Sequence, residues 1–273
     1  MAFRLPSAGN YVRWTTNLPS QNSYTVCGWF TPVATATNGS VIQLSYSGTP
    51  DYHQMSYDAT NSKFVGGTSY DYTGYDIRTG ISAGTPVFVA ITSSGVGIGT
   101  VKMYVGVSGD TALTSTTYSN NTWGGAPNEL AFLDCYSNEP TNGRITDIKV
   151  YDTALTSDQL VAQMARMLPV SYSSLRMWIP SLSGTLSDAL KDYSGNGYDL
   201  SAVGTPTIED NPPIPYGAPV QAFASGLSSR IGTFNKTLSN LTLSSGGTFS
   251  TAGSLNATMP NLTLSSSGGV LSV

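Results

Sequence analysis

The chain has 273 residues and a formal charge of −4, with 12 lysines and arginines against 16 aspartates and glutamates. So sparse a set of cations excludes the basic surface that nucleic-acid binding requires. Serine (37 residues), threonine (33) and glycine (29) are abundant, and because they disfavour helices while threonine suits strands, the composition predicts an all-β protein.

The N-terminal residues and the hydropathy of the sequence indicate where the protein is expected in the cell. No stretch approaches the roughly 20 apolar residues of a membrane-spanning helix. The first residues, MAFRLPSAGNYVRW, lack the apolar core and the small-residue cleavage site of a secretory signal. We therefore expect no membrane span and synthesis in the cytoplasm. The chain then either stays there or leaves by another route, such as cell lysis within an assembled particle.

Short alternating segments recur through the first 150 residues, separated by Gly, Pro, Asn and Ser. They predict antiparallel strands at Tyr24–Phe30, Val41–Tyr46, Val87–Thr92, Val101–Val107 and Leu130–Tyr136. In the fourth segment we expect the valines and Met103 to face the core, with Lys102 and Tyr104 on the outside.

One helix is marked at both ends. Thr156 and Gln159 have the spacing of a capping box. Apolar residues then recur at helical spacing until Pro169. The sequence predicts a short amphipathic helix over residues 156–168 that packs against the sandwich.

Cysteine and histidine are scarce. Cys27 and Cys135 show no metal-ligand spacing, so we expect buried free thiols, and one long-range disulfide is the alternative. His53 is the only histidine. A zinc site built on histidines or a Ser-His-Asp mechanism would therefore have to use His53.

Two segments follow the helix. Residues 171–221 are rich in proline and glycine, which predicts an extended segment that packs back on the sandwich of residues 1–170. In residues 222–273, rich in Ser, Thr and Gly, the sequence NLTLSS occurs twice, starting at Asn240 and at Asn261. This repetition predicts a β-repeat tail that assembles with its own copies or attaches to a partner. A disordered low-complexity tail is the alternative.

Three passages carry a family resemblance: YTVCGWFTP, GTPVFVAITSSGVGIGTVKMYVGVSGD and GRITDIKVYDTALTSDQLVAQM. In this order they resemble the strands and closing helix of the laminin-G-like, concanavalin A-like jelly-roll family. The matching features are Trp29 before a turn, the hairpin of Val87–Thr92 with Val101–Val107, and the helix start Ala154-Leu155-Thr156. The resemblance covers residues 1–170 and implies an all-β jelly-roll sandwich with one short helix.

The segment Trp178–Pro215, with DYSGNGYDL and DNPPIP, resembles the tail that follows such domains in many bacteriophage proteins. A fold does not dictate function, so this resemblance is an analogy. With the repeat tail, it favours a non-enzymatic virion component, a head decoration or fibre protein on the virion surface. Such a protein would assemble as a homotrimer and bind virion shell proteins. A free-standing bacterial lectin or adhesin is the alternative.

The same fold hosts endo-glucanases, which place two or three carboxylates on one face of a strand, and hydrolysis needs an acid and a nucleophile close together. The nearest carboxylates here, Glu129, Asp134 and Glu139, are five residues apart, which fits neither strand alternation nor the family motif. We expect no enzyme activity, and a glycoside hydrolase is the less favoured alternative.

The family often holds one calcium ion through aspartates, and loop aspartates occur at Asp51, Asp58, Asp71, Asp76 and Asp110. No fixed spacing selects a pair of ligands, and solvated aspartates that form turns are the simpler interpretation. We expect no cofactor, and a structural calcium ion stays open.

Tyrosines cluster between Tyr46 and Tyr75, interleaved with aspartates, His53 and Gln54. A tyrosine ring packs on the apolar face of a pyranose while polar neighbours bind its hydroxyls. Tyrosine is also common in protein interfaces and on strand surfaces, so glycan stacking, a protein interface and plain packing all stay open. The candidate glycan- or partner-binding residues are Tyr52, Tyr57, Tyr70, Tyr72, Tyr75 and Trp123.

Overall fold

The computed structural model describes residues 2–4, 10–15, 23–45, 52–67, 75–95, 99–120, 129–133, 141–181, 184–210, 214 and 216. The chain divides into two compact units, Met1–Pro219 and Val220–Val273, and every described element belongs to the first. The predicted repeat tail of residues 222–273 lies outside the described residues. In the described part, no helix has the length and apolar character needed to cross a membrane.

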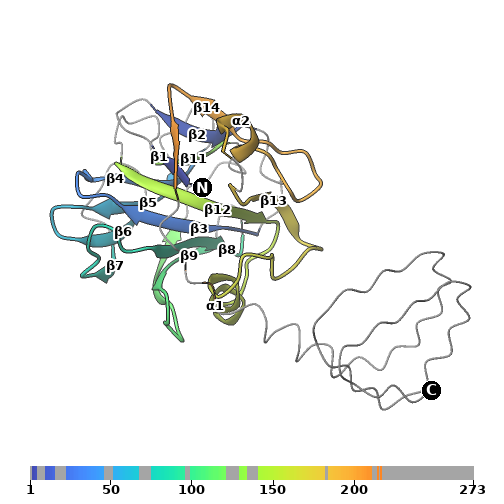
Figure 1. The fold of residues 1–273 in the computed structure, drawn as a ribbon. Helices are drawn as coiled ribbons and strands as arrows, with labels where there is room; N and C mark the ends of the chain where they lie inside the picture. The colour runs from blue at the N-terminus through green and yellow to red at the C-terminus, as the bar shows by residue number, and fades with distance from the viewer. Residues whose placement is uncertain are drawn as a thin grey trace, which may run out of the picture. The chain divides into compact units, whose positions relative to one another are not determined.

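The first unit is a sandwich of two antiparallel sheets (Figure 1). Sheet A has eight strands, in the order β10 (Thr114–Asn120), β9 (Gly99–Val107), β8 (Val87–Ser93), β3 (Tyr24–Pro32), β12 (Gly143–Tyr151), β1 (Ala2–Arg4) and β15 (Thr207–Glu209), with β13 (Leu175–Ile179) paired to β12. Sheet B has seven, in the order β14 (Ser201–Val203), β2 (Tyr11–Trp14), β11 (Glu129–Phe132), β4 (Gly39–Ser45), β5 (Tyr52–Asp58), β6 (Lys63–Gly67) and β7 (Tyr75–Thr79). The predicted all-β jelly-roll class is confirmed.

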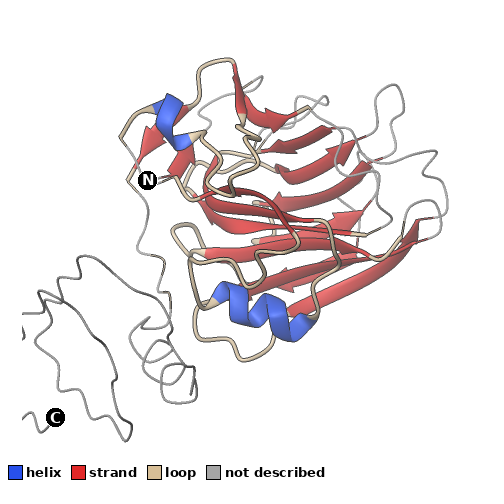
Figure 2. Cartoon of the chain, turned by 90° about the vertical axis from the view of Figure 1, so that its right-hand side faces the viewer, coloured by secondary structure: helices blue, strands red, loops and turns tan. Residues whose placement is uncertain are grey.

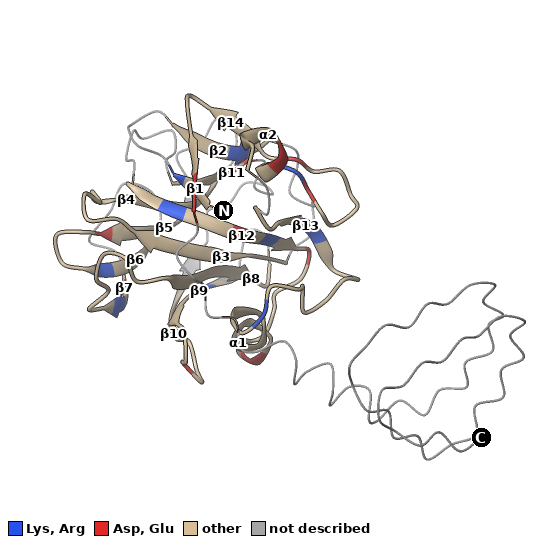
Figure 3. Cartoon of the chain, viewed as in Figure 1, with Lys and Arg blue, Asp and Glu red and all other residues tan. Residues whose placement is uncertain are grey.

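All five predicted strands are present, as β3, β4, β8, β9 and β11. The last is shorter than predicted. It ends at Phe132 because Leu133 has a φ of 69°, which takes the chain out of the extended conformation. Charged residues occupy little of the strand ribbon, as the composition predicts (Figure 3).

Strand alternation divides the apolar side chains of sheet A between two clusters. Val26 and Phe30 of β3 belong to the core between the sheets, whereas Cys27 and Trp29 belong to a second cluster on the opposite face. Tyr104 faces away from the core as predicted, but it is buried in that second cluster. The outer face of sheet A is therefore a packing surface, and α1 (Ser157–Met164) covers it (Figure 2).

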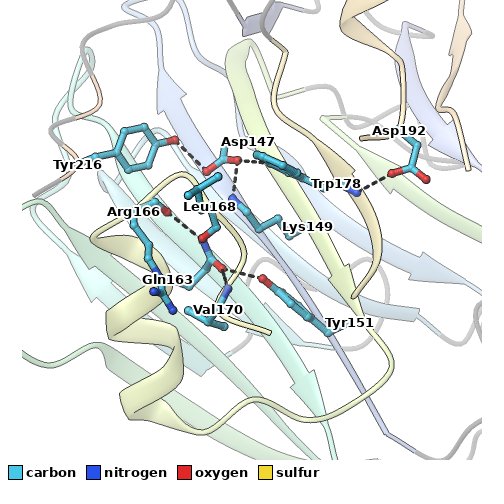
Figure 4. Close-up of polar contacts among 10 residues, drawn as sticks. All are labelled: Asp147, Lys149, Tyr151, Gln163, Arg166, Leu168, Val170, Trp178, Asp192 and Tyr216. Atoms are coloured by element: carbon cyan, nitrogen blue, oxygen red, sulfur yellow. Dashed lines mark hydrogen bonds and ion pairs between the residues drawn. The ribbon is translucent and has the colours of Figure 1, made fainter. Parts of the chain in front are cut away.

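The capping box that begins α1 is confirmed, because the Thr156 side chain accepts from the Gln159 N–H and the Gln159 side chain accepts from the Thr156 N–H. The helix ends earlier than predicted, at Met164. After the helix, the buried side chain of Gln163 binds the backbone. Its amide nitrogen donates to the carbonyls of Arg166 and Leu168 (Figure 4). The chain therefore turns around Gln163 instead of continuing as a helix.

Gln163 also accepts two hydrogen bonds, from the Tyr151 hydroxyl at 2.6 Å and from the Val170 N–H at 3.0 Å. Gln163→Ala is expected to lower the free energy of unfolding by about 2 kcal/mol, because both donors lose a buried acceptor. Urea denaturation followed by tryptophan fluorescence measures this loss. Gln159→Ala, an exposed change in the same helix, is the control and is expected to cost about 0.5 kcal/mol. Equal losses in the two variants would contradict the assigned role of Gln163.

The segment after α1 supplies more regular structure than the extended chain that its composition predicts. It adds β13 and β15 to sheet A and β14 to sheet B, and it contains a second helix, α2 (Leu186–Ala189), that the sequence analysis missed. Thr185 caps α2 by accepting from the Asp188 N–H. A one-turn helix has no apolar periodicity, so only its cap could have indicated it.

The DYSGNGYDL motif covers the free edge of β13. The Asp192 carboxylate accepts from the backbone N–H of Trp178 at 2.9 Å and from that of Tyr198 at 3.0 Å. The Asn196 amide donates to the carbonyls of Leu175 and Arg176. These side chains satisfy backbone groups that an unprotected edge would offer to another chain, so the motif has a structural role here.

Cys27 is a free thiol, buried in the second cluster, which confirms that part of the prediction. Burial raises its pKa to about 12, and the partial compensation from the Lys149 charge is smaller. Cys135 lies outside the described residues. Cys27 is therefore a packing residue without thiolate reactivity.

Candidate functional site

The outer face of sheet B is polar. On β4, β5 and β11, alternate residues such as Ile42, Met55 and Leu130 pack in the core, so the residues between them face outward. The pairing register then sets one row of outward residues directly opposite one another across five strands. This polar row consists of Arg13, Ala131, Gln43, Gln54 and Gly67.

Residues beside the polar row are also polar and buried. Glu129 and Ser45 form the neighbouring pair on one side, and Ser40 and Ser56 form the pair on the other. All four residues are buried, and Glu129 has 7% of its surface exposed. An outward sheet face that is both polar and buried must satisfy its hydrogen-bonding groups within the fold or through a ligand.

The two glutamines of the polar row differ in this respect. The Gln54 amide nitrogen donates to the hydroxyls of Ser40 at 2.5 Å and Ser56 at 2.9 Å. Gln43 is only 2% exposed, yet neither its amide nitrogen nor its amide oxygen has a hydrogen-bond partner in the part of the chain that the structure describes. The fold therefore leaves one donor and one acceptor group of the row unused at Gln43.

Arg13 lies two strands from Gln43, with the small side chain of Ala131 between them. One guanidinium nitrogen of Arg13 is 3.5 Å from a carboxylate oxygen of Glu129, and the Arg13 Nε has no hydrogen-bond partner among the described residues. Two strand spacings separate Arg13 from Gln43, about 10 Å. Long side chains with unused hydrogen-bonding groups thus flank a position that carries only a methyl group.

The sequence was compared with models of known protein families. The model of the concanavalin A-like lectin/glucanases superfamily matches residues 6–161, more than half of the chain. This chain belongs to that superfamily. A comparison with curated proteins gives no match.

Solved structures of this lectin-like class show similarity at low identity. A pentraxin from Limulus polyphemus is 19% identical, with 59% of this chain and 79% of that one covered and a TM-score of 0.44. Domain 4 of an arabinanase from Geobacillus stearothermophilus is 24% identical, with 56% and 71% covered and a TM-score of 0.40. The tailspike protein 2 domain of bacteriophage CBA120 is 12% identical, with 60% and 27% covered and a TM-score of 0.42. At these values no ligand or activity is carried over to this chain.

The superfamily contains lectins and glucanases, and a glucanase needs two carboxylates close together. The carboxylates of the outer face of sheet B were therefore compared in position. In the described part of this face they are Glu129, Asp58 and Asp76. Glu129 is level with Tyr52, and Asp58 lies six residues further along β5, a separation of about 20 Å. A glycosidase pair is about 5 to 10 Å apart, so Glu129 and Asp58 do not form one.

The predicted aromatic residues do not form one described cluster. Tyr57 is a correction: its ring is buried in the core, because it lies on the inward face of β5 and its hydroxyl donates to the Ile81 carbonyl at 2.9 Å. Tyr75 is 61% exposed on β7. Tyr52 lies opposite Ser45, beside the polar row by register. Three candidates, Tyr70, Tyr72 and Trp123, lie outside the described residues.

The described aspartates among the calcium candidates form hydrogen bonds or ion pairs with protein residues. Asp58 accepts from the backbone and side chain of Asn61 in the β5–β6 turn, Asp76 pairs with Lys63, and Asp110 pairs with Arg78. Within the described ranges, no group of three His, Cys, Asp or Glu residues could hold a metal ion. Asp51 and Asp71 lie outside those ranges, and the expectation of no cofactor, with a structural calcium ion left open, stays a prediction.

A second buried polar cluster lies on the outer face of sheet A and consists of Asp147, Lys149, Trp178 and Tyr216 (Figure 4). Asp147 occupies a β-bulge of β12 with a φ of 51°, and its carboxylate accepts from the Lys149 ammonium at 2.5 Å, the Trp178 indole at 3.0 Å and the Tyr216 hydroxyl at 2.8 Å. Burial raises the pKa of Asp147, and Lys149 opposes that shift. Each of these groups has a partner within the cluster, so we assign the Asp147 cluster to structure.

Sequence reasoning missed Gln43 and Arg13. The available signal was the glutamine between Ile42 and Leu44 in the segment VIQLS. Such a residue breaks the apolar pattern of a buried strand and marks a position where polarity has a role.

Proposed function

We propose that this chain is a non-enzymatic glycan-binding protein that recognises its ligand with the polar row of sheet B. The single observation that supports this is Gln43, whose amide is buried and unused by the fold. A sugar hydroxyl both donates and accepts, so it complements an amide that offers both functions. The separation of Glu129 from Asp58 supports binding without hydrolysis.

In the bound state, ligand hydroxyls accept from the Gln43 amide nitrogen and from Arg13 Nε, and donate to the Gln43 amide oxygen. Ala131, between these side chains, carries only a methyl group. Because the unused groups already lie on paired strands, the ligand meets a site held in place before binding.

A buried amide without partners is a cost to the free protein, and this sets the test. Gln43→Met, similar in length and apolar, is expected to raise the free energy of unfolding by about 1 to 3 kcal/mol. The same variant is expected to lose glycan binding at least tenfold on a glycan array and in titration calorimetry. A Gln43→Met protein that binds as tightly as the wild type would refute the proposed site.

Gln54→Met is the matched control for stability, because it removes the same group from the adjacent strand of the row. Gln54 is hydrogen-bonded to Ser40 and Ser56, so its loss is expected to lower the free energy of unfolding by about 1 kcal/mol. Opposite signs for the two substitutions, measured by urea denaturation, distinguish an unused amide from a structural one.

The setting that we propose is the surface of a bacteriophage virion, as a head decoration or fibre protein that displays the glycan-binding sandwich. The support is the NLTLSS repeat of residues 222–273, whose strand-like pattern is too thin to be stable alone. We propose homotrimer assembly and attachment to virion shell proteins through this segment. Light scattering on the full chain and on a chain without residues 222–273 tests assembly, and a trimer that persists without this segment would contradict it. A monomeric full chain that binds glycans would favour the free-standing lectin.

A further inference from the structure

Asparagine precedes glycine at three described places in the chain: Asn38-Gly39, Asn142-Gly143 and Asn196-Gly197. In such a pair the glycine backbone nitrogen reaches the asparagine side-chain carbonyl easily, because glycine has no side chain to block the approach. The third pair lies in the DYSGNGYDL motif. We propose that Asn196 is a site of spontaneous deamidation and that its conversion uncovers the edge of β13.

Strands hold the glycines of the first two pairs. Gly39 begins β4 opposite Tyr57, and Gly143 begins β12 opposite Pro32, and both glycines are buried. A Cβ added at Gly143 would lie 2.3 Å from the ring of Phe30, so the backbone packs closely against that ring. Ring closure at either pair therefore requires the end of a strand to leave its sheet.

Asn196 and Gly197 lie in an exposed turn instead. Gly197 has a φ of 74°, and apart from its chain neighbours no atom lies within 4 Å of the place that a Cβ would occupy. The Gly197 backbone N–H has no hydrogen-bond partner among the described residues. The attacking nitrogen is therefore accessible, and ring closure disturbs only the turn.

The reaction needs water and no other reagent. The Gly197 nitrogen bonds to Asn196 Cγ, and the Cγ–Nδ2 bond breaks. Nδ2 leaves as ammonia, with the proton that the Gly197 nitrogen gives up. Water then opens the cyclic imide at one of its two carbonyls, which leaves aspartate or isoaspartate at position 196. Because the deprotonated nitrogen attacks, the rate is expected to rise with pH.

The side chain that reacts is one that covers the edge of β13. Asn196 Nδ2 donates to the carbonyls of Leu175 at 3.1 Å and Arg176 at 2.9 Å, and to Ser194 Oγ at 3.1 Å. Deamidation replaces this donor with a carboxylate oxygen, which only accepts and which repels the two carbonyls. Two backbone acceptors of an edge strand then become available to another chain.

The same hydrogen bonds hold the amide in the intact protein, so the turn must open before the ring closes. An exposed turn opens locally at a lower free energy than the strands of a core. We therefore expect Asn196 to convert at least about tenfold faster than Asn38 and Asn142 in the folded protein.

Peptide mapping by mass spectrometry measures all three pairs in one sample of the full chain, incubated at mildly alkaline pH. Each conversion adds about 1 Da to its peptide. The same incubation in concentrated urea is the control. There the three rates are expected to lie within about threefold of one another, because unfolding removes the structural difference between the pairs.

The effect on the edge is measured with Asn196→Asp in the full chain. This variant is expected to unfold at a lower urea concentration than the wild type and to gain mass by association on storage, as seen by light scattering. Asn38→Asp is the matched control. The Asn38 side-chain oxygen accepts from the Thr60 N–H at 3.2 Å, and an aspartate keeps that acceptor, so both changes are expected to be smaller.

Conversion of Asn196 no faster than that of the other two pairs overturns the inference. An equal advantage of Asn196 in urea also overturns it, because the local sequence and not the fold would then set the rate. The effect on β13 is refuted if Asn196→Asp and Asn38→Asp have the same urea midpoint and the same mass in solution. Should Asn196→Asp fail to fold, fresh and incubated wild-type chains are compared in the same two measurements, and identical results refute that effect.

Discussion

Asp147→Ala is expected to lower the free energy of unfolding by about 3 to 5 kcal/mol, the range for removing one partner of a buried ion pair. The Lys149 side chain is 1% exposed and would lose its carboxylate partner within the second apolar cluster. The Trp178 indole and the Tyr216 hydroxyl would lose their acceptor as well. Urea denaturation followed by tryptophan fluorescence measures the loss.

Two further variants serve as comparisons for the loss of stability in Asp147→Ala. Tyr216→Phe removes one hydrogen bond of the cluster and is expected to cost about 1 kcal/mol. Asp76→Asn disrupts an ion pair at the surface and is expected to change stability little, because solvent screens such pairs. If Asp147→Ala cost no more than Tyr216→Phe, the buried ion pair would not be a main support of sheet A.

Lowering the pH from 7 to 5 is expected to cost the wild-type protein about 2 kcal/mol of unfolding free energy through His53 alone. Burial lowers the pKa of His53 from 6.5 to about 3 in the folded protein. Below pH 6.5 only the unfolded chain takes up this proton, so stability falls by about 1.4 kcal/mol per pH unit and the loss approaches about 4 kcal/mol near pH 3.5.

His53→Gln separates this effect from that of the carboxylates. The variant has no group that titrates at this position, so its unfolding free energy is expected to change about 2 kcal/mol less between pH 7 and pH 5 than that of the wild type. Urea denaturation at both values gives the difference. Parallel pH dependence in the two proteins would show that His53 is not buried in its neutral form.

Local patterns carried the prediction of fold class. Alternation placed β3, β8 and β9, and the Thr156–Gln159 capping box placed the start of α1, because these signals depend on neighbouring residues alone. The end of α1 was wrong because it depends on Gln163, whose partners at Tyr151 and Val170 come from the strand before and the turn after the helix. The prediction of Tyr57 as a binding residue was wrong for a similar reason. Its hydroxyl donates to the carbonyl of Ile81, which follows much later in the chain.

The amino-acid sequence by itself determined that this chain forms an antiparallel sandwich, because a period of two is a property of consecutive residues. It did not determine the candidate site. Arg13, Gln43, Gln54 and Ala131 come from four strands, and only the pairing register of sheet B makes them one row. That register depends on how every strand buries its apolar face, so it is decided by packing across the whole sheet. Whether a polar side chain in the row is hydrogen-bonded within the fold, like Gln54, or has no partner among the described residues, like Gln43, follows from that packing and from nothing local.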